Sequence, residues 1–219
     1  IGRRLNRLSE QCNRALTVAA VIGREFEIDQ LVRLVEGASE DGLLESLDQA
    51  LSARLIEEIP QIVGRYQFTH ALIQETLVEE LSLTRRVRLH AHIAETLEQM
   101  YGDDADGNAT ELAHHFAQAE AMLGSEKLAH YSVVAGKNAS RRFAFEEAVT
   151  QLERALNIKN DQDDDEETAA ILSDLSRALI FMGQSREAAV HIKRAFAYYA
   201  QAEDVTSATA VVEFPHNTI

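Results

Sequence analysis

Two segments of ten residues decide the fold class: EAVTQLERAL at residues 147–156 and EAAVHIKRAF at residues 187–196. Both begin with Glu-Ala, carry a large aliphatic residue at the sixth position, and end in Arg-Ala followed by a large apolar residue. Alanines at this helical spacing let two helices approach closely, and the large residue between them fills the remaining space. Every matched position differs by the same offset, so the two segments predict an internal repeat built from helices.

The repeat predicts that helices come in pairs. Gly136 stands where the first helix of a pair needs a small residue, and Ser176 replaces it in the next copy. The pattern is similar to that of tetratricopeptide repeats, whose period is about 34 residues, and the acidic loop at 161–167 lengthens it here. One pair cannot bury its apolar face alone, so we expect the pairs to stack. The expected helices are at residues 125–140, 143–158, 166–182 and 185–202.

An earlier pair is predicted before these. Its first helix carries Leu89, Ile93 and Leu97 at helical spacing, and its second helix runs to Leu123. The segment 108–111, Asn-Ala-Thr-Glu, predicts a capping box at the start of that second helix. A polar connector is expected at residues 101–107.

The segment 1–82 follows another pattern. Ser9 and Ser39 are predicted N-caps of two helices, and Tyr66 and Phe68 alternate with polar neighbours as in a half-buried strand. Three helices followed by a two-stranded hairpin is the winged-helix layout. The expected elements are helices at 8–21, 28–35, 39–54 and 71–81, with strands at 55–59 and 65–69.

The predicted fold class is therefore mainly α. We expect a winged-helix domain with a small β-hairpin at residues 1–82. A tetratricopeptide-like helical-repeat array follows at residues 83–219 and is expected to be incomplete at its C-terminus.

Composition excludes several classes of protein. The net charge of the 219 residues is −15, which argues against a general binder of polyanions. The longest apolar stretch, residues 16–22, is far shorter than the roughly 20 residues that span a bilayer. The single Cys12 cannot form an internal disulfide, so a cytoplasmic location is expected. Because the sequence begins with Ile1 rather than Met, we expect it to be part of a longer protein.

No catalytic set is predicted in these residues. The Gly136-Lys137 pair lacks the rest of a phosphate-binding loop, because Tyr131 stands in place of the first glycine and Asn138 in place of the hydroxyl residue. Cys12 falls on the apolar face of the first helix, where a small core residue is the expected role. We therefore predict no enzyme activity for this stretch.

No metal site is predicted either. His90 and His92 are two residues apart, and His114 and His115 are adjacent. Side chains at these spacings point in different directions on a helix, whereas chelation by a helix favours histidines four residues apart. We expect ordinary surface or half-buried histidines.

Direct DNA binding is disfavoured by charge. The third predicted helix, which is the reading helix in many winged-helix proteins, carries four acidic residues against the one cation Arg54. Its face would repel phosphates, whose binding normally depends on basic contacts. We expect no direct contact with nucleic acid.

Five segments occur in an order that resembles a known family. They are residues 7–9, 21–26, 66–75, 88–94 and 111–116. Together they resemble the region just after the ATPase core in signalling ATPases of the STAND class, such as multidomain LuxR-type regulators and ATPase-containing adenylate cyclases. The resemblance covers nearly the whole chain and weakens after Ala202. It leaves open whether the parent's output domain binds DNA or is a cyclase.

The resemblance implies a winged helix packed against the parent's own upstream ATPase domain, followed by a helical-repeat sensor for an inducer or a protein. In related ATPases, a histidine of the winged domain contacts the bound diphosphate, and the matching residue here is His70. ATP or ADP is expected on the missing ATPase domain, and no cofactor is expected within these residues. The alternative for His70 is that it only caps a helix or fills a pocket.

Two rival functions remain open at this point. One is a freestanding winged-helix transcription factor that binds DNA. The other is a plain tetratricopeptide-like scaffold with no nucleotide-linked partner. The family resemblance favours a regulatory segment that couples sensing by the helical repeats to the nucleotide state of the ATPase core.

Overall fold

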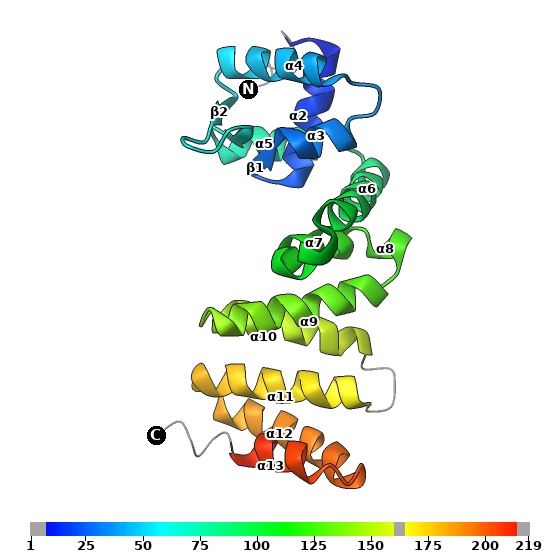
Figure 1. The fold of residues 1–219 in the computed structure, drawn as a ribbon, viewed down its shortest axis with the longest axis vertical. Coiled ribbons are helices and arrows are strands. Elements are labelled where there is room, and N and C mark those ends of the chain that lie inside the picture. Colours follow the sequence, from blue (N-terminus) through cyan, green and yellow to red (C-terminus); the bar gives the residue numbers. More distant parts are fainter. Residues whose placement is uncertain (1–7, 160–164, 214–219) are drawn as a thin grey trace. The chain divides into compact units, whose positions relative to one another are not determined.

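The computed structural model describes residues 8–159 and 165–213. These residues are mainly helical and include one small antiparallel sheet (Figure 1). The chain divides into two compact units. The first comprises the described residues up to Met100 together with Ala121–Leu123, and the second comprises the other described residues. The domain boundary predicted at residues 82–83 stays a prediction.

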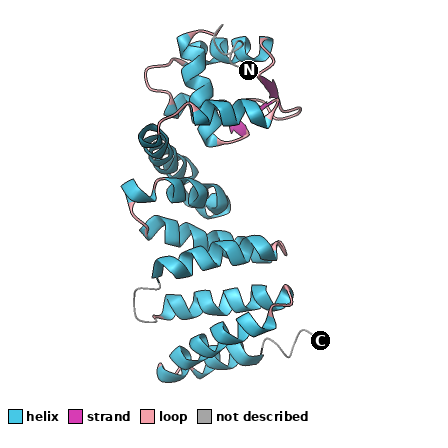
Figure 2. Ribbon diagram, turned by 180° about the vertical axis from the view of Figure 1, so that it is seen from behind, coloured by secondary structure: helices cyan, strands magenta, loops and turns pink. Residues whose placement is uncertain are grey.

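The first unit combines helices with the sheet. Its strand β3 lies between β1 and β2 and pairs antiparallel with both. Figure 2 draws the strands in magenta. The elements are α2 (Glu10–Ile22), β1 (Glu25–Glu27), α3 (Ile28–Leu34), α4 (Glu40–Ser52), β2 (Ile56–Glu58), β3 (Arg65–Phe68), α5 (Ala71–Glu79) and α6 (Leu83–Tyr101). The predicted helices and hairpin are confirmed, and β1 adds a third strand to the sheet.

Buried aromatic side chains of β1 and β3 pack against one another within this sheet. Phe26 of β1 is buried, and its ring centroid lies 5.6 Å from that of Phe68 and 5.9 Å from that of Tyr66. The two glutamates that flank Phe26 are exposed, so β1 has the alternation of a half-buried strand. Arg65 and Glu25 form an ion pair of 3.0 Å between β3 and β1.

The predicted N-caps of this unit are confirmed. Ser9 accepts a hydrogen bond from the backbone N–H of Cys12 at 3.1 Å, and Ser39 accepts one from the N–H of Gly42 at 3.1 Å. Cys12 is fully buried in the core, as expected, and burial raises the pKa of its thiol to about 11. That thiol is therefore protonated at neutral pH and suited to packing rather than to nucleophilic chemistry.

The second unit consists of helices, and its successive pairs repeat in structure as well as in sequence. The first helices α9 and α11 begin at Glu126 and Glu166, which is the same offset as between Glu147 and Glu187 of the two repeat segments. The ends of α9 and α11, and the starts of the second helices α10 and α12, differ by that offset too. The elements are η1 (Gly102–Asn108), α7 (Ala109–Gln118), α9 (Glu126–Arg141), α10 (Phe145–Lys159), α11 (Glu166–Phe181), α12 (Ser185–Gln201) and α13 (Val205–Glu213). The short helix α8 (Glu120–Leu123) follows α7 in the chain, but its residues Ala121–Leu123 belong to the first unit.

One local prediction in this part of the chain is wrong. The polar connector before α7 is present and forms a 3₁₀ helix, η1, but the predicted capping box is not formed. The amide of Asn108 instead donates to the carbonyl of Asp104, while Glu111 accepts a 2.6 Å hydrogen bond from the Tyr101 hydroxyl. The side chains of Asn108 and Glu111 therefore have other partners. The reason is that η1 leads directly into α7, so the chain is already helical where the capping box was predicted.

Other differences concern the ends of the predicted elements. The predicted helix that runs to Leu123 is interrupted at Ala119, which separates α7 from α8. At the far end, α13 packs on the preceding helices through Ala208 and Val211, which are buried. The acidic loop predicted at 161–167 lies largely outside the described residues.

Small residues set the distance between paired helices. Gly136 of α9 faces α10, where a Cβ atom on this glycine would lie only 2.6 Å from Cγ of Leu152 and 3.3 Å from the carbonyl oxygen of Ala148. Leu152 and Ala148 are fully buried, so neither has room to move away. Hence α9 and α10 pack as closely as they do only because position 136 has no side chain.

Replacement of Gly136 by Ala should destabilise the protein. Alanine favours a helix by about 1 kcal/mol over glycine, but overpacking a filled core costs roughly 1–3 kcal/mol, and the contact here is shorter than any ordinary one. We expect a lower midpoint of urea unfolding, followed by circular dichroism at 222 nm. Gly107→Ala is the control, since a Cβ there meets nothing within 4 Å. Equal midpoints for the two variants would contradict the packing.

A carboxylate caps α11 and ties it to α10. Asp165 accepts a 2.7 Å hydrogen bond from the backbone N–H of Thr168 and a 3.2 Å hydrogen bond from Nζ of Lys159. Lys159 also pairs with Glu167. The hydrogen bonds from Thr168 and then the ammonium of Lys159 lower the pKa of Asp165 from its ordinary 3.8 to about 2.

This cap predicts a pH-dependent contribution to stability. Because folding lowers the pKa of Asp165, its stabilisation is present above pH 3.8 and is lost as the pH falls through about 2. At pH 7, Asp165→Ala should lower the free energy of unfolding by roughly 0.5–2 kcal/mol, and the difference from wild type should shrink as the pH falls from 5 to 3. Asp165→Asn keeps a neutral cap and should lie between the two at pH 7. A deficit of Asp165→Ala that is constant with pH would speak against a charged cap.

Candidate functional site

His70 lies at the N-terminus of α5, directly after the hairpin. It is exposed, and its side chain makes no capping hydrogen bond. Its carbonyl accepts a 3.0 Å hydrogen bond from the N–H of Ile73, so only the backbone of His70 takes part in starting the helix. The first turn of α5 holds no acidic side chain that would offset the positive end of the helix dipole. An imidazole at this position is accessible to an anionic group from outside the unit.

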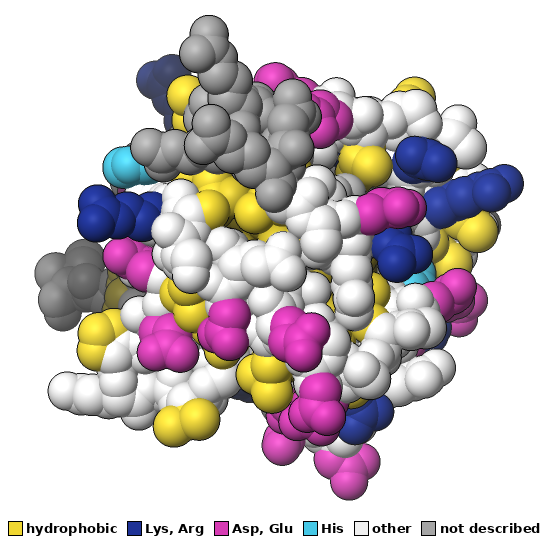
Figure 3. Space-filling view, turned by 90° about the horizontal axis from the view of Figure 1, so that it is seen from above, with side chains coloured by type: hydrophobic (Ala, Val, Ile, Leu, Met, Phe, Trp, Pro, Cys, Tyr) yellow, Lys and Arg dark blue, Asp and Glu magenta, His cyan; other side chains and the backbone are white. Residues whose placement is uncertain are grey.

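The exposed face of α4 is acidic. It presents Glu40, Asp41, Glu45 and Asp48, and no cation lies within this helix. The view from above in Figure 3 shows acidic side chains at several places on the surface, most of them in the lower half of the view. Such a face repels nucleic-acid phosphates.

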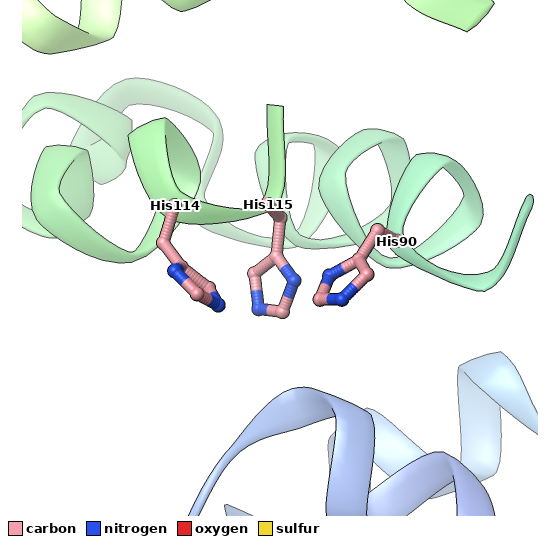
Figure 4. A group of neighbouring side chains, drawn as sticks. All are labelled: His90, His114 and His115. Atoms are coloured by element: carbon pink, nitrogen blue, oxygen red, sulfur yellow. The ribbon is translucent and has the colours of Figure 1, made fainter. Parts of the chain in front are cut away.

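The histidines considered as metal ligands are spread over both units. His90 is a buried residue of α6, in the first unit, whereas His114 and His115 follow one another on α7, in the second. His115 is fully buried and His114 is exposed, with ring centroids 5.2 Å apart (Figure 4). Burial and then the charge of Arg154 lower the pKa of His114. Within the described residues, neither unit alone brings three His, Cys, Asp or Glu ligands together.

The second unit contains a pocket of about 430 Å³ between α9 and α11. Three phenylalanines form its aromatic wall. The rings of Phe145 and Phe181 are stacked, with centroids 4.6 Å apart and planes 10° apart, and Phe143 meets Phe145 edge-on with a centroid distance of 6.1 Å. Phe143 is 77% exposed and Phe181 49%, so much of this aromatic surface is open to solvent.

Cationic side chains also line the pocket. Lys137 and Arg141 come from α9 and Arg177 from α11, against a single carboxylate, Asp174. Asp174 lies 3.8 Å from Lys137 and 3.7 Å from Arg177, which is longer than the roughly 2.7–2.9 Å of a charge-assisted hydrogen bond. Burial raises the pKa of Asp174, while the three cations oppose that rise. The pocket is thus positive in a chain whose net charge is −15.

The repeat explains how two of these cations come together. Lys137 and Arg177 are separated by one full repeat and hold equivalent positions on successive first helices. Stacked repeats place equivalent positions side by side along one face. The repeat offset was therefore a usable sequence signal for this pocket, although the sequence prediction did not include it.

Phe143 has a strained backbone. Its φ is 61°, in the left-handed region that side chains rarely adopt, and it ends α9 through a turn in which Ala144 N–H donates to Ala139. The equivalent position of the next pair is Gly183, with φ 77°, and the same hydrogen bond recurs there from Gln184 to Leu179. Glycine forms this turn without strain, so the turn itself does not require the exposed aromatic side chain at position 143.

Comparisons with known proteins add no relative. No protein-family model matches the chain, no curated protein matches it, and no solved structure matches it.

The strain at Phe143 predicts an unusual pair of substitutions. Phe143→Gly relieves about 1 kcal/mol of backbone strain in the folded state. Glycine also raises the conformational entropy of the unfolded chain, which lowers stability by a similar amount. The two effects nearly cancel, so the midpoint of thermal unfolding should stay within about 3 °C of wild type. Phe143→Ala loses the same ring but keeps the strain, and should be the less stable variant. Calorimetry of both variants measures which of the two has the lower midpoint of thermal unfolding. Greater stability of the alanine variant would show that the turn is not strained.

Proposed function

We propose that this chain is a regulatory segment of a STAND-class signalling ATPase. Its first unit acts as a winged-helix domain that docks on the parent's nucleotide-binding core, and its second unit acts as a tetratricopeptide-like sensor. Ligand binding by the sensor biases that docking and so the transcriptional or cyclase output. The segment performs no reaction itself and works in the cytoplasm, in keeping with its single, buried, unbridged Cys12.

The observation that carries this proposal is the exposed, uncapped imidazole of His70. A phosphate sensor must reach a ligand held by another domain, and a buried or capping histidine would not be able to do so. His70 follows β3 and starts α5, so it is held by a sheet with a buried aromatic core. An imidazole there can donate a hydrogen bond to a phosphate oxygen.

The element order supports the winged-helix interpretation of the first unit. Three helices, α2, α3 and α4, precede a hairpin formed by β2 and β3, and α5 follows it. In the second unit, the equal spacing of successive helix ends and the recurrence of the turn at positions 143 and 183 support the interpretation as stacked repeats. Such arrays present extended surfaces for binding.

The acidic α4 disfavours the rival proposal of a freestanding DNA-binding factor. A reading helix normally contributes basic contacts to phosphates, and this one carries only carboxylates among its charged residues. The plain scaffold is the other rival. It would bind partners through the helical array without any effect of nucleotide.

The test is His70→Ala in the full-length parent protein. Loss of a hydrogen bond to a charged phosphate removes roughly 1.5–3 kcal/mol, so release of a fluorescent ADP analogue should accelerate about ten- to hundred-fold in a stopped-flow experiment. His130→Ala is the matched control, because His130 is an exposed histidine on α9 in the second unit. Unchanged release for His70→Ala, with normal unfolding, would remove the sensor role of His70.

A further inference from the structure

We propose that the pocket between α9 and α11 binds a small aryl carboxylate. Its carboxylate lies against Lys137 and Arg177, and its ring lies on the phenylalanine wall. This inference names the ligand class of the sensor and so rests on the proposed function for the consequence of binding. The binding itself is argued from the pocket alone.

The size of the pocket favours a small molecule. Small-molecule sites range from roughly 300 to 1,000 Å³, and the volume of about 430 Å³ falls within that range. Such sites combine an apolar surface with a few polar groups that fix orientation. Here the lining combines both kinds of group, with aromatic rings near helix ends at Phe143, Phe145 and Phe181 and cations on α9 and α11. A ligand with one charged end and one flat apolar end matches this combination.

The charge pattern favours a single negative charge. Asp174 already neutralises part of the field of Lys137, Arg141 and Arg177, and its contacts with Lys137 and Arg177 are long. A carboxylate matches the geometry of a guanidinium group, which can donate two parallel hydrogen bonds. A bound carboxylate would add a second negative charge among the three cations that line the pocket.

The aromatic wall favours a flat ring. Phe145 and Phe181 are stacked on each other, and Phe143 stands edge-on beside them with most of its surface exposed. Aromatic rings associate in offset-stacked and edge-to-face arrangements. The next repeat has glycine at the equivalent position, Gly183, so this ring is specific to the pair formed by α9 and α10.

Isothermal titration calorimetry of this chain tests the proposal with three probes. We expect 3-phenylpropionate to bind with a Kd of about 1 mM, a value ordinary for a ligand of this size. Its neutral amide, which lacks the charge, and propionate, which lacks the ring, should each bind at least about tenfold more weakly. Equal binding of the acid and the amide would overturn the proposal.

Substitutions locate the site. Arg177→Gln and Lys137→Gln should each weaken binding of 3-phenylpropionate roughly tenfold, and Phe143→Gly should weaken it several-fold without loss of stability. Lys193→Gln on α12 is the matched control, because Lys193 is exposed and does not line the pocket. Unchanged binding in all three pocket variants would place the ligand elsewhere and overturn the proposal.

Two further outcomes separate this proposal from its alternatives. A peptide ending in Phe carries the same carboxylate and ring, and tight binding of that peptide without binding of the free acid would overturn the small-molecule assignment. Binding of the acid with no effect on ADP release from the parent would leave the pocket assignment standing and count against the proposed function. Absence of binding would overturn the pocket assignment and leave the His70 test unaffected.

Discussion

The close approach of α9 and α10 at Gly136 is the constraint on which the second unit depends. A methyl group at position 136 would lie 2.6 Å from Leu152, whose side chain is fully buried. The distance between the two helices is therefore set by the absence of a side chain. Ala148 and Ala155 on α10 are also fully buried, and their equivalents on α12 are buried in the same way. Small residues at these positions keep the helices of each pair close enough to stack as repeats.

The pocket follows from the same constraint. Because the pairs repeat with one period, the first helices α9 and α11 present equivalent positions on one face, and Lys137 comes beside Arg177. The stacked rings of Phe145 and Phe181 then join the second helix of one pair to the first helix of the next. In the proposed sensor role, a ligand that contacts two successive repeats at once would favour one spacing between them.

Much of the fold was predictable from the sequence because its signals are local or periodic. The serine caps act within one turn, and the alanine spacing recurs from one repeat to the next. The strand β1 was missed because a three-residue strand around Phe26 carries too little pattern. The capping box failed because Asn108 and Glu111 find other partners, which depends on the path of the chain before α7. The pocket needed the stacking of two pairs, which no single segment encodes.

The most direct test of this account is a nuclear Overhauser spectrum of the isotope-labelled chain. The packing predicts strong cross-peaks between the Hα protons of Gly136 and the δ-methyl protons of Leu152. The same spectrum should show cross-peaks between the ring protons of Phe145 and Phe181. Absence of both sets from a well-resolved spectrum of the folded chain would contradict the pairing of α9 with α10 and the stacking of successive pairs, and with them the pocket.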